Sequence, residues 1–123
     1  MMRSKAKWQF KGATRWVFIV GRYAVKIPSL HNWRCFLNGL LGNMQETQFS
    51  KTGHEKLCPV LFSIWGGWLV IMPFCPKLID AHYSVISRNF SSWIDVGEMV
   101  LPVENKYNSF GYYKGMVVAV DYG

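Results

Sequence analysis

The chain has 123 residues, of which 50% are hydrophobic and 16% aromatic, enough for a single domain with its own core. Its formal net charge is +7, and no acidic residue precedes Glu46. The N-terminal third is therefore expected to be a positive surface, which would favour a phosphate-rich ligand, nucleic acid or an acidic protein.

The cysteines and the N-terminus indicate a reducing compartment. Cys35, Cys58 and Cys75 have no CxxC spacing, and the first seven residues lack the apolar run of a secretion signal. This pattern argues against a disulfide framework and predicts a cytoplasmic protein. The three histidines show no metal-ligand spacing with the cysteines, so no zinc site is expected.

The first half of the chain predicts three strands and a helix. Short β-prone runs at 8–10, 16–20 and 22–27 are separated by turn residues. A helix is predicted over 32–48, because apolar residues recur there at helical spacing. They form one apolar stripe of Trp33, Phe36, Leu37, Leu40, Leu41 and Met44.

The segment 57–75 carries no charge and is almost long enough to cross a bilayer. It contains Gly66 and Gly67 near its middle, flanked by β-branched and aromatic residues. A Gly-Gly turn between two such runs predicts a β-hairpin, so we expect strands at 59–65 and 68–73 and no membrane span.

The last third is less regular. Residues 77–94 can hold one or two short helices, and Ser91-Ser92 is a possible helix start. Residues 111–115 are expected to be a turn-rich link, followed by a buried strand over 116–120 that ends at Asp121.

Two motifs in the first half are similar to protein kinases. Tyr23-Ala-Val-Lys26 resembles the V-A-I-K element, whose lysine reaches the nucleotide phosphates and pairs with a helix glutamate. Glu46, in the helix that follows, is the expected partner. Counting back from Val17, Gly12 matches one glycine of the glycine-rich loop, while Arg15 stands at another and would either add charge near a phosphate or block the site.

Two further motifs lie near the C-terminus. Asp121-Tyr-Gly resembles the D-F-G element, whose aspartate binds magnesium, and Asn108 lies near the interval of the second metal-binding residue. Aligned on Asn108, the position of the catalytic base holds Val103, which cannot accept a proton. Glu104 is adjacent and could replace it only if the loop were rebuilt.

The resemblance covers nearly the whole chain and implies an α+β fold. It implies a kinase-like N-lobe over 1–75, with a five-stranded antiparallel sheet and one packed helix, and a much reduced C-lobe over 76–123. Small kinase-like proteins of bacteriophages look similar around 103–111 and 118–123. They imply a pseudokinase in the host cytoplasm that binds a host or viral protein, and inhibits or redirects it, with ATP and Mg²⁺ as candidate ligands.

Two other functions stay open. One is an atypical ATP-dependent phosphotransferase that uses Glu104 or no base at all, since phosphoryl transfer depends mainly on positioning and charge. The other is nucleic-acid binding through the basic N-terminal third. The oligomeric state is also open, and exposed rings among Trp65, Trp68, Tyr112 and Tyr113 would favour self-association or partner binding.

Overall fold

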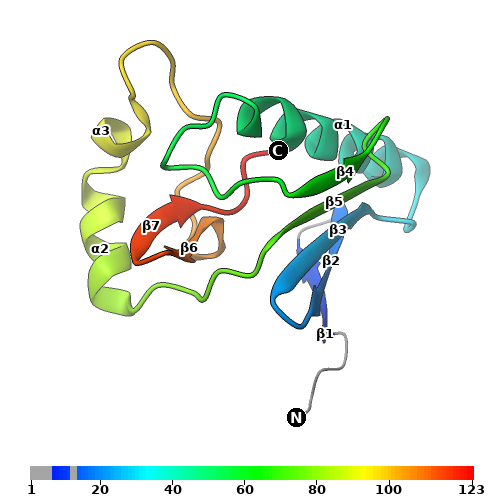
Figure 1. The fold of residues 1–123 in the computed structure, drawn as a ribbon, viewed down its shortest axis with the longest axis horizontal. Helices are drawn as coiled ribbons and strands as arrows, with labels where there is room; N and C mark the ends of the chain where they lie inside the picture. Colours follow the sequence, from blue (N-terminus) through cyan, green and yellow to red (C-terminus); the bar gives the residue numbers. More distant parts are fainter. Residues whose placement is uncertain (1–6, 12–13) are drawn as a thin grey trace.

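The computed structural model describes residues 7–11 and 14–123, with side chains from Thr14 onward. Its elements follow one another along the chain as shown in Figure 1. They are β1 (Lys7–Lys11), β2 (Arg15–Val20), β3 (Tyr23–Pro28), α1 (Trp33–Ser50), β4 (Phe62–Ile64), β5 (Leu69–Pro73), α2 (Asp80–Arg88), α3 (Phe90–Ile94), the short 3₁₀ helix η1 (Tyr107–Ser109), β6 (Phe110–Tyr113) and β7 (Met116–Ala119).

The main sheet is antiparallel throughout, in the order β1-β2-β3-β5-β4. Side chains are described for β2, β3, β5 and β4, whereas β1 is described by its backbone pairing with β2. Lys26 lies within β3, opposite Val17 of β2 and Val70 of β5. An α+β class with an antiparallel sheet is thus confirmed, and the likeness to a kinase lobe stays a prediction.

The uncharged segment forms the predicted hairpin of β4 and β5. Its turn contains Gly66 and Gly67 with φ of +88° and +81°, a backbone region that side chains other than glycine rarely adopt. A Cβ atom on Gly67 would also overlap the carbonyl oxygen of Leu40 on α1, so the turn docks directly on the helix. Among the described residues, no helix combines the length and hydropathy needed to cross a membrane.

The apolar stripe that predicts α1 is not the face that packs against the sheet. Trp33 and Leu41 are 76% and 60% exposed, whereas the buried residues of α1 are Cys35, Gly39, Asn43 and Glu46. These four positions repeat at helical spacing and form a second face of small and polar side chains. The periodicity of apolar residues located the helix correctly, but the apolar face that it indicates is not the face of α1 that packs against the sheet.

Close packing explains why the buried face contains glycine. A Cβ atom on Gly39 would overlap the carbonyl oxygen of Thr14 and lie 2.7 Å from Cα of Pro28. The helix backbone therefore lies almost against the ends of β2 and β3, and a larger apolar residue would not fit there. Asn32 caps the helix, since its side chain accepts a hydrogen bond from the backbone N–H of Cys35 at 2.9 Å.

The C-terminal region contains a second, two-stranded sheet where a turn-rich link was expected. Residues 110–113 form β6, which pairs antiparallel with β7, so the prediction of a link over 111–115 is wrong. The two strands are joined by the two residues Lys114 and Gly115. Their φ angles are 52° and 79°, and two successive positive values are typical of a tight hairpin turn. Of the one or two short helices predicted over 77–94, two are present as α2 and α3, and α3 begins at Phe90, before Ser91.

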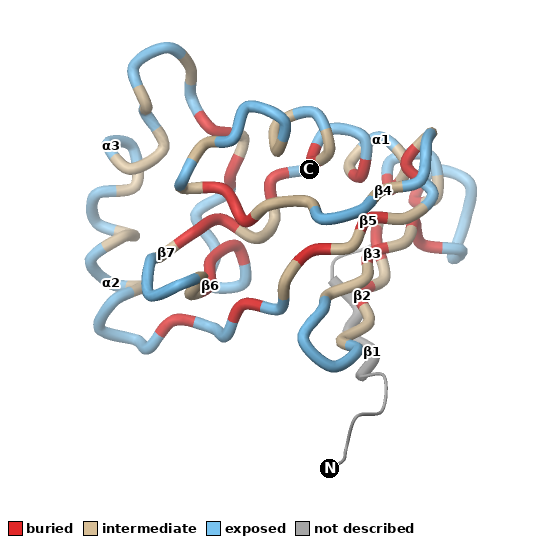
Figure 2. The backbone as a smooth tube through the Cα atoms, in the orientation of Figure 1, coloured by how far each residue is buried: buried red, intermediate tan, exposed pale blue. Residues whose placement is uncertain are grey.

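The hydrophobic core is formed by buried residues of β5, β6 and β7 and of the loops beside these strands, and stretches of these segments are red in Figure 2. Phe110 is one of its members, and the centroid of its ring lies 5.3 Å from that of Trp93 in an edge-on contact. Figure 1 shows the chain leaving β7 and returning toward α1, so the C-terminal residues run between the two sheets and the helix. This return places the last few residues beside β3 and α1.

Candidate functional site

A cleft of about 560 Å³ lies between the main sheet and the β6–β7 hairpin. One wall comes from β2, β3 and β5, and the opposite wall comes from η1, β6 and the residue after β7. Most lining side chains are apolar, with the cations of Lys26 and Lys77 among them. The lining residues are Val17, Ile19, Ala24, Lys26, Cys58, Met72, Pro73, Phe74, Cys75, Lys77, Asn108, Phe110 and Val120.

Lys26 and Glu46 form the predicted ion pair. Lys26 Nζ lies 3.0 Å from both carboxylate oxygens of Glu46, and both side chains are buried. The same amine donates to the carbonyl oxygen of Val120 at 2.5 Å. The three hydrogens of the Lys26 ammonium group therefore all have acceptors within the protein.

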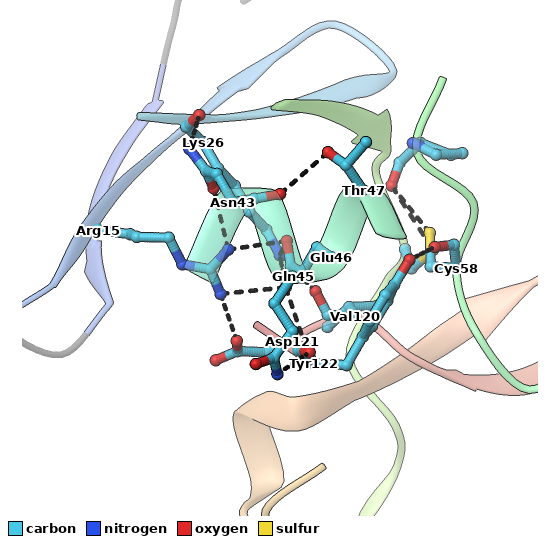
Figure 3. A network of polar contacts seen from close by, with 12 residues as sticks. Arg15, Lys26, Asn43, Gln45, Glu46, Thr47, Cys58, Val120, Asp121 and Tyr122 are labelled. Atoms are coloured by element: carbon cyan, nitrogen blue, oxygen red, sulfur yellow. Dashed lines mark hydrogen bonds and ion pairs between the residues drawn. The ribbon is translucent and has the colours of Figure 1, made fainter. Parts of the chain in front are cut away.

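Arg15 joins the second carboxylate to this pair, as Figure 3 shows. Its Nη1 lies 2.8 Å from Glu46 Oε1, and its Nη2 lies 2.5 Å from Asp121 Oδ1. Nη1 also donates to Asn43 Oδ1 at 3.1 Å. The amine from β3, the helix carboxylate and the carboxylate after β7 thus converge, as predicted, but Asp121 enters the network through Arg15.

The charges in this network stabilise one another strongly. Burial would raise the pKa of Glu46, but the cations of Lys26 and Arg15 outweigh burial and lower this pKa to about 2. Burial would likewise lower the pKa of Arg15, but the carboxylates of Glu46 and Asp121 keep it above its ordinary value. Glu46 and Arg15 therefore both carry their charges at neutral pH.

Backbone groups complete the network. The N–H of Tyr122 donates to Glu46 Oε2 at 2.9 Å, and the amide of Gln45 donates to the carbonyl of Tyr122 at 2.9 Å. Asn43 uses its side-chain amide to donate to the carbonyls of Lys26 and Gly67 at 3.2 and 2.9 Å. A single face of α1 therefore holds β3, the β4–β5 turn and the C-terminal segment in fixed positions.

The remaining predicted residues lie on η1, on the loop before it, or outside the described part of the chain. Gly12 belongs to the residues that the structure does not describe. Asn108 lies in η1, exposed, and lines the cleft. Val103 is buried in the core, while Glu104 is exposed and paired with Lys106 at 3.0 Å, away from the residues that line the cleft.

Metal-binding potential is weak within the described residues. No three side chains among their His, Cys, Asp and Glu residues gather as a metal site would require. The carboxylate of Asp121 already has the Arg15 guanidinium as its cation. Magnesium prefers carboxylates and water at free octahedral positions, and this donor set does not fit it as it stands.

The expected basic surface is smaller than the charge count indicates. Arg15 and Lys26 are buried, and their charges are balanced by Glu46 and Asp121. Two of the cations that precede the first acidic residue therefore contribute little to the outer field. A nucleic-acid surface in the N-terminal third has correspondingly less support.

Comparisons with known proteins identify no family for this chain. A search against protein-family models finds no match, and a search of curated proteins finds none either.

Two members of the network were not among the predicted site residues, although the sequence contains a signal for each. Arg15 is two residues from Val17 in β2, so the two side chains point to the same buried face. Asn43 precedes Glu46 by three positions and follows Gly39 by four, which puts all three on one helix face. Alternation and helical spacing could have placed both residues beside the Lys26–Glu46 pair.

Proposed function

We propose that the chain is a non-catalytic binding protein whose cleft takes an adenine nucleotide. The observation that carries this proposal is that Lys26, paired with Glu46, lies in the wall of a cleft of about 560 Å³. Small-molecule sites are typically concave, largely apolar and lined by a few placed polar groups, with volumes of roughly 300–1,000 Å³.

The residues that line the cleft suit a flat ring with an anionic tail. Val17, Ala24 and Met72 on the sheet side and Phe110 on the other supply apolar surface for a purine. Lys77, which is exposed and lines the cleft, supplies a cation for phosphate. Lys26 gives a fixed positive charge at the inner wall, although its hydrogens already have acceptors.

Catalysis is not part of the proposal. The position that aligns with the catalytic base holds Val103, which is buried in the core. Glu104 is exposed, paired with Lys106, and not among the residues lining the cleft. A proton acceptor must come within hydrogen-bond reach of the reacting hydroxyl, and neither residue is placed for that role.

Magnesium is also not part of the proposal, although Asn108 and Asp121 resemble the metal-binding positions of kinases. Arg15 holds the carboxylate of Asp121 and supplies the positive charge that a metal would bring. We therefore expect nucleotide binding that does not require a divalent cation.

Isothermal titration tests the site. ATP should bind in the presence of EDTA, and Ala24→Phe should abolish binding because the ring fills the cleft without touching the ion network. Ala81→Phe, on exposed α2, is the matched control and should bind normally. Lys77→Met should weaken ATP by about two- to fivefold and leave adenosine unchanged, since an exposed ion pair contributes at most about 1 kcal/mol.

Three results would contradict the proposal. If ATP gave no heat of binding, the cleft would not be a nucleotide site. If binding required Mg²⁺, the carboxylate of Asp121 would bind the metal in place of the Arg15 guanidinium. Transfer of labelled phosphate from ATP, abolished by both Lys26→Ala and Asp121→Ala, would show that the protein is a kinase after all.

A second observation favours protein binding. An exposed apolar surface continues from α1 onto the β4–β5 hairpin, because the rings of Phe36 and Trp68 lie 5.4 Å apart. Trp65 at the hairpin turn is 90% exposed. We propose that this α1–hairpin surface binds an apolar segment of a host protein. Its exposed members are Trp33, Leu37, Leu41, Trp65 and Trp68.

The partner segment should have acidic flanks. Arg34 is the exposed charge of α1, and the chain as a whole has a net charge of +7. A synthetic amphipathic helix of leucine and glutamate should bind the wild type and fail to bind the double variant Leu37→Gln, Leu41→Gln. Equal binding to both would rule out this surface, and a dimer in sedimentation velocity that the double variant abolishes would assign it to a second copy instead.

A further inference from the structure

Two thiols meet in the wall of the cleft. Cys58 Sγ and Cys75 Sγ lie 3.3 Å apart, and both residues are buried. Cys58 precedes β4 and Cys75 follows β5, so the pair closes the base of the β4–β5 hairpin. No spacing motif connects them in the sequence, and the fold alone brings them together.

The surroundings make the two thiols unequal. Cys58 is fully buried, while Cys75 is 9% exposed and both line the cleft. The hydrogen bond between the sulfurs lowers the pKa of Cys75 and raises that of Cys58, and the nearby charge of Lys26 favours the Cys75 thiolate further. Cys75 is therefore the better nucleophile, and the cleft gives a small reagent a path to it.

We propose that Cys58 and Cys75 form a reversible dithiol–disulfide couple that exchanges with small disulfide compounds entering the cleft. The Cys75 thiolate attacks one sulfur of the small disulfide, which forms a mixed disulfide and releases the first small thiol. The Cys58 thiolate then attacks Cys75 Sγ, forms the Cys58–Cys75 bond and releases the second small thiol. The two protein thiols are oxidised, the small disulfide is reduced, and the two thiol protons end on the two small thiols.

Bond formation needs little movement. A disulfide bond is about 2.05 Å long, so the two sulfurs must approach by only about 1.2 Å in total. The backbone of Cys58 is already held: its N–H donates to the carbonyl of Ala119 at 2.9 Å, and its carbonyl accepts from the Tyr122 hydroxyl at 2.5 Å. The two sulfurs are therefore already close to bonding distance before oxidation.

Oxidation would change the cleft as well as the chain. The new bond would replace two thiol groups in a cleft that Met72 and Phe110 also line. It would close a loop around the hairpin, which restricts the unfolded chain and raises the unfolding midpoint. The couple would thus link the redox state of the surroundings to the stability of this wall.

Thiol counting with bis(2-hydroxyethyl) disulfide tests the couple without any nucleotide. The folded wild type should fall from three alkylatable cysteines to one, lose the mass of two hydrogen atoms, and give one peptide pair that links Cys58 to Cys75. Dithiothreitol should restore all three thiols. The matched control Cys35→Ser, on α1, should form the same linked pair.

The single variants separate a couple from ordinary thiol reactivity. Cys58→Ser should stop at a stable mixed disulfide on Cys75, whereas Cys75→Ser should react much more slowly at Cys58. The inference fails if wild-type protein keeps three free thiols, if the linked pair includes Cys35, or if Cys58→Ser reacts no faster than Cys75→Ser. The wild-type peptide map decides the matter even if a serine variant does not fold.

Discussion

At the scale of single residues, Arg15 links the two carboxylates of the site. Its guanidinium contacts carboxylates from α1 and from the segment after β7, in a planar geometry that a lysine could not reproduce. Buried charges are costly unless each has a partner, and this network gives every one of its members at least one. The site should therefore respond sharply when one charge is removed.

Protonation of Glu46 should destabilise the protein in acid. The pKa of Glu46 is lowered from 4.5 to about 2, so its contribution is fully present above pH 4.5 and is lost as the pH falls toward 2. This loss should amount to on the order of 3 kcal/mol of unfolding free energy. Urea unfolding followed over this pH range measures it.

The exposed carboxylate of Glu104 provides the control for this acid effect. Glu104→Gln should leave the pH profile of stability unchanged, because this side chain faces solvent. An unfolding free energy that stays constant between about pH 5 and pH 2 would mean that the Glu46 network does not stabilise the fold.

At the scale of elements, α1 shows which features the sequence could predict. The helix and its Lys26–Glu46 pairing were predictable, because the lysine is in a strand and the glutamate is in the helix that follows. The packed face was not predictable from hydrophobicity, since it consists of small and polar residues that fit against β2 and β3. The apolar stripe marks the opposite side, which is exposed.

A matched pair of leucine substitutions tests this orientation of α1. Leu41→Ala should change the unfolding free energy by less than about 0.5 kcal/mol, because Leu41 is 60% exposed. Leu101→Ala should cost about 2–5 kcal/mol, because Leu101 is buried in the core. Chemical denaturation measures both, and a large loss for Leu41→Ala would mean that the stripe is the packed face.

At the scale of the whole molecule, the C-terminal segment joins the two halves of the chain. Tyr122 is fully buried, and it contacts Glu46 of α1 through its N–H and Cys58 through its hydroxyl. Sequence reasoning placed Asp121 beside the site but did not assign a structural role to Tyr122. A tertiary contact between residues 64 positions apart leaves no local pattern to read.

The halves 1–75 and 76–123 should consequently unfold as one unit. Tyr122→Ala should cost about 3–5 kcal/mol and lower hydrogen-exchange protection in both halves equally. The control Tyr23→Ala, at an exposed position in β3, should cost about 1 kcal/mol or less. Loss of protection confined to residues 76–123 would show two separate folding units, which mass spectrometry of deuterated peptides can distinguish.

The cation between the two carboxylates of the site is the guanidinium of Arg15, which is part of the chain itself. A dissolved ion beside two carboxylates has an occupancy that rises and falls with its concentration, whereas a side chain fixed to β2 is present in every folded molecule. Arginine also does not lose its proton at any physiological acidity. The electrostatic state of this ion network should therefore be the same in every cellular setting in which the chain is folded.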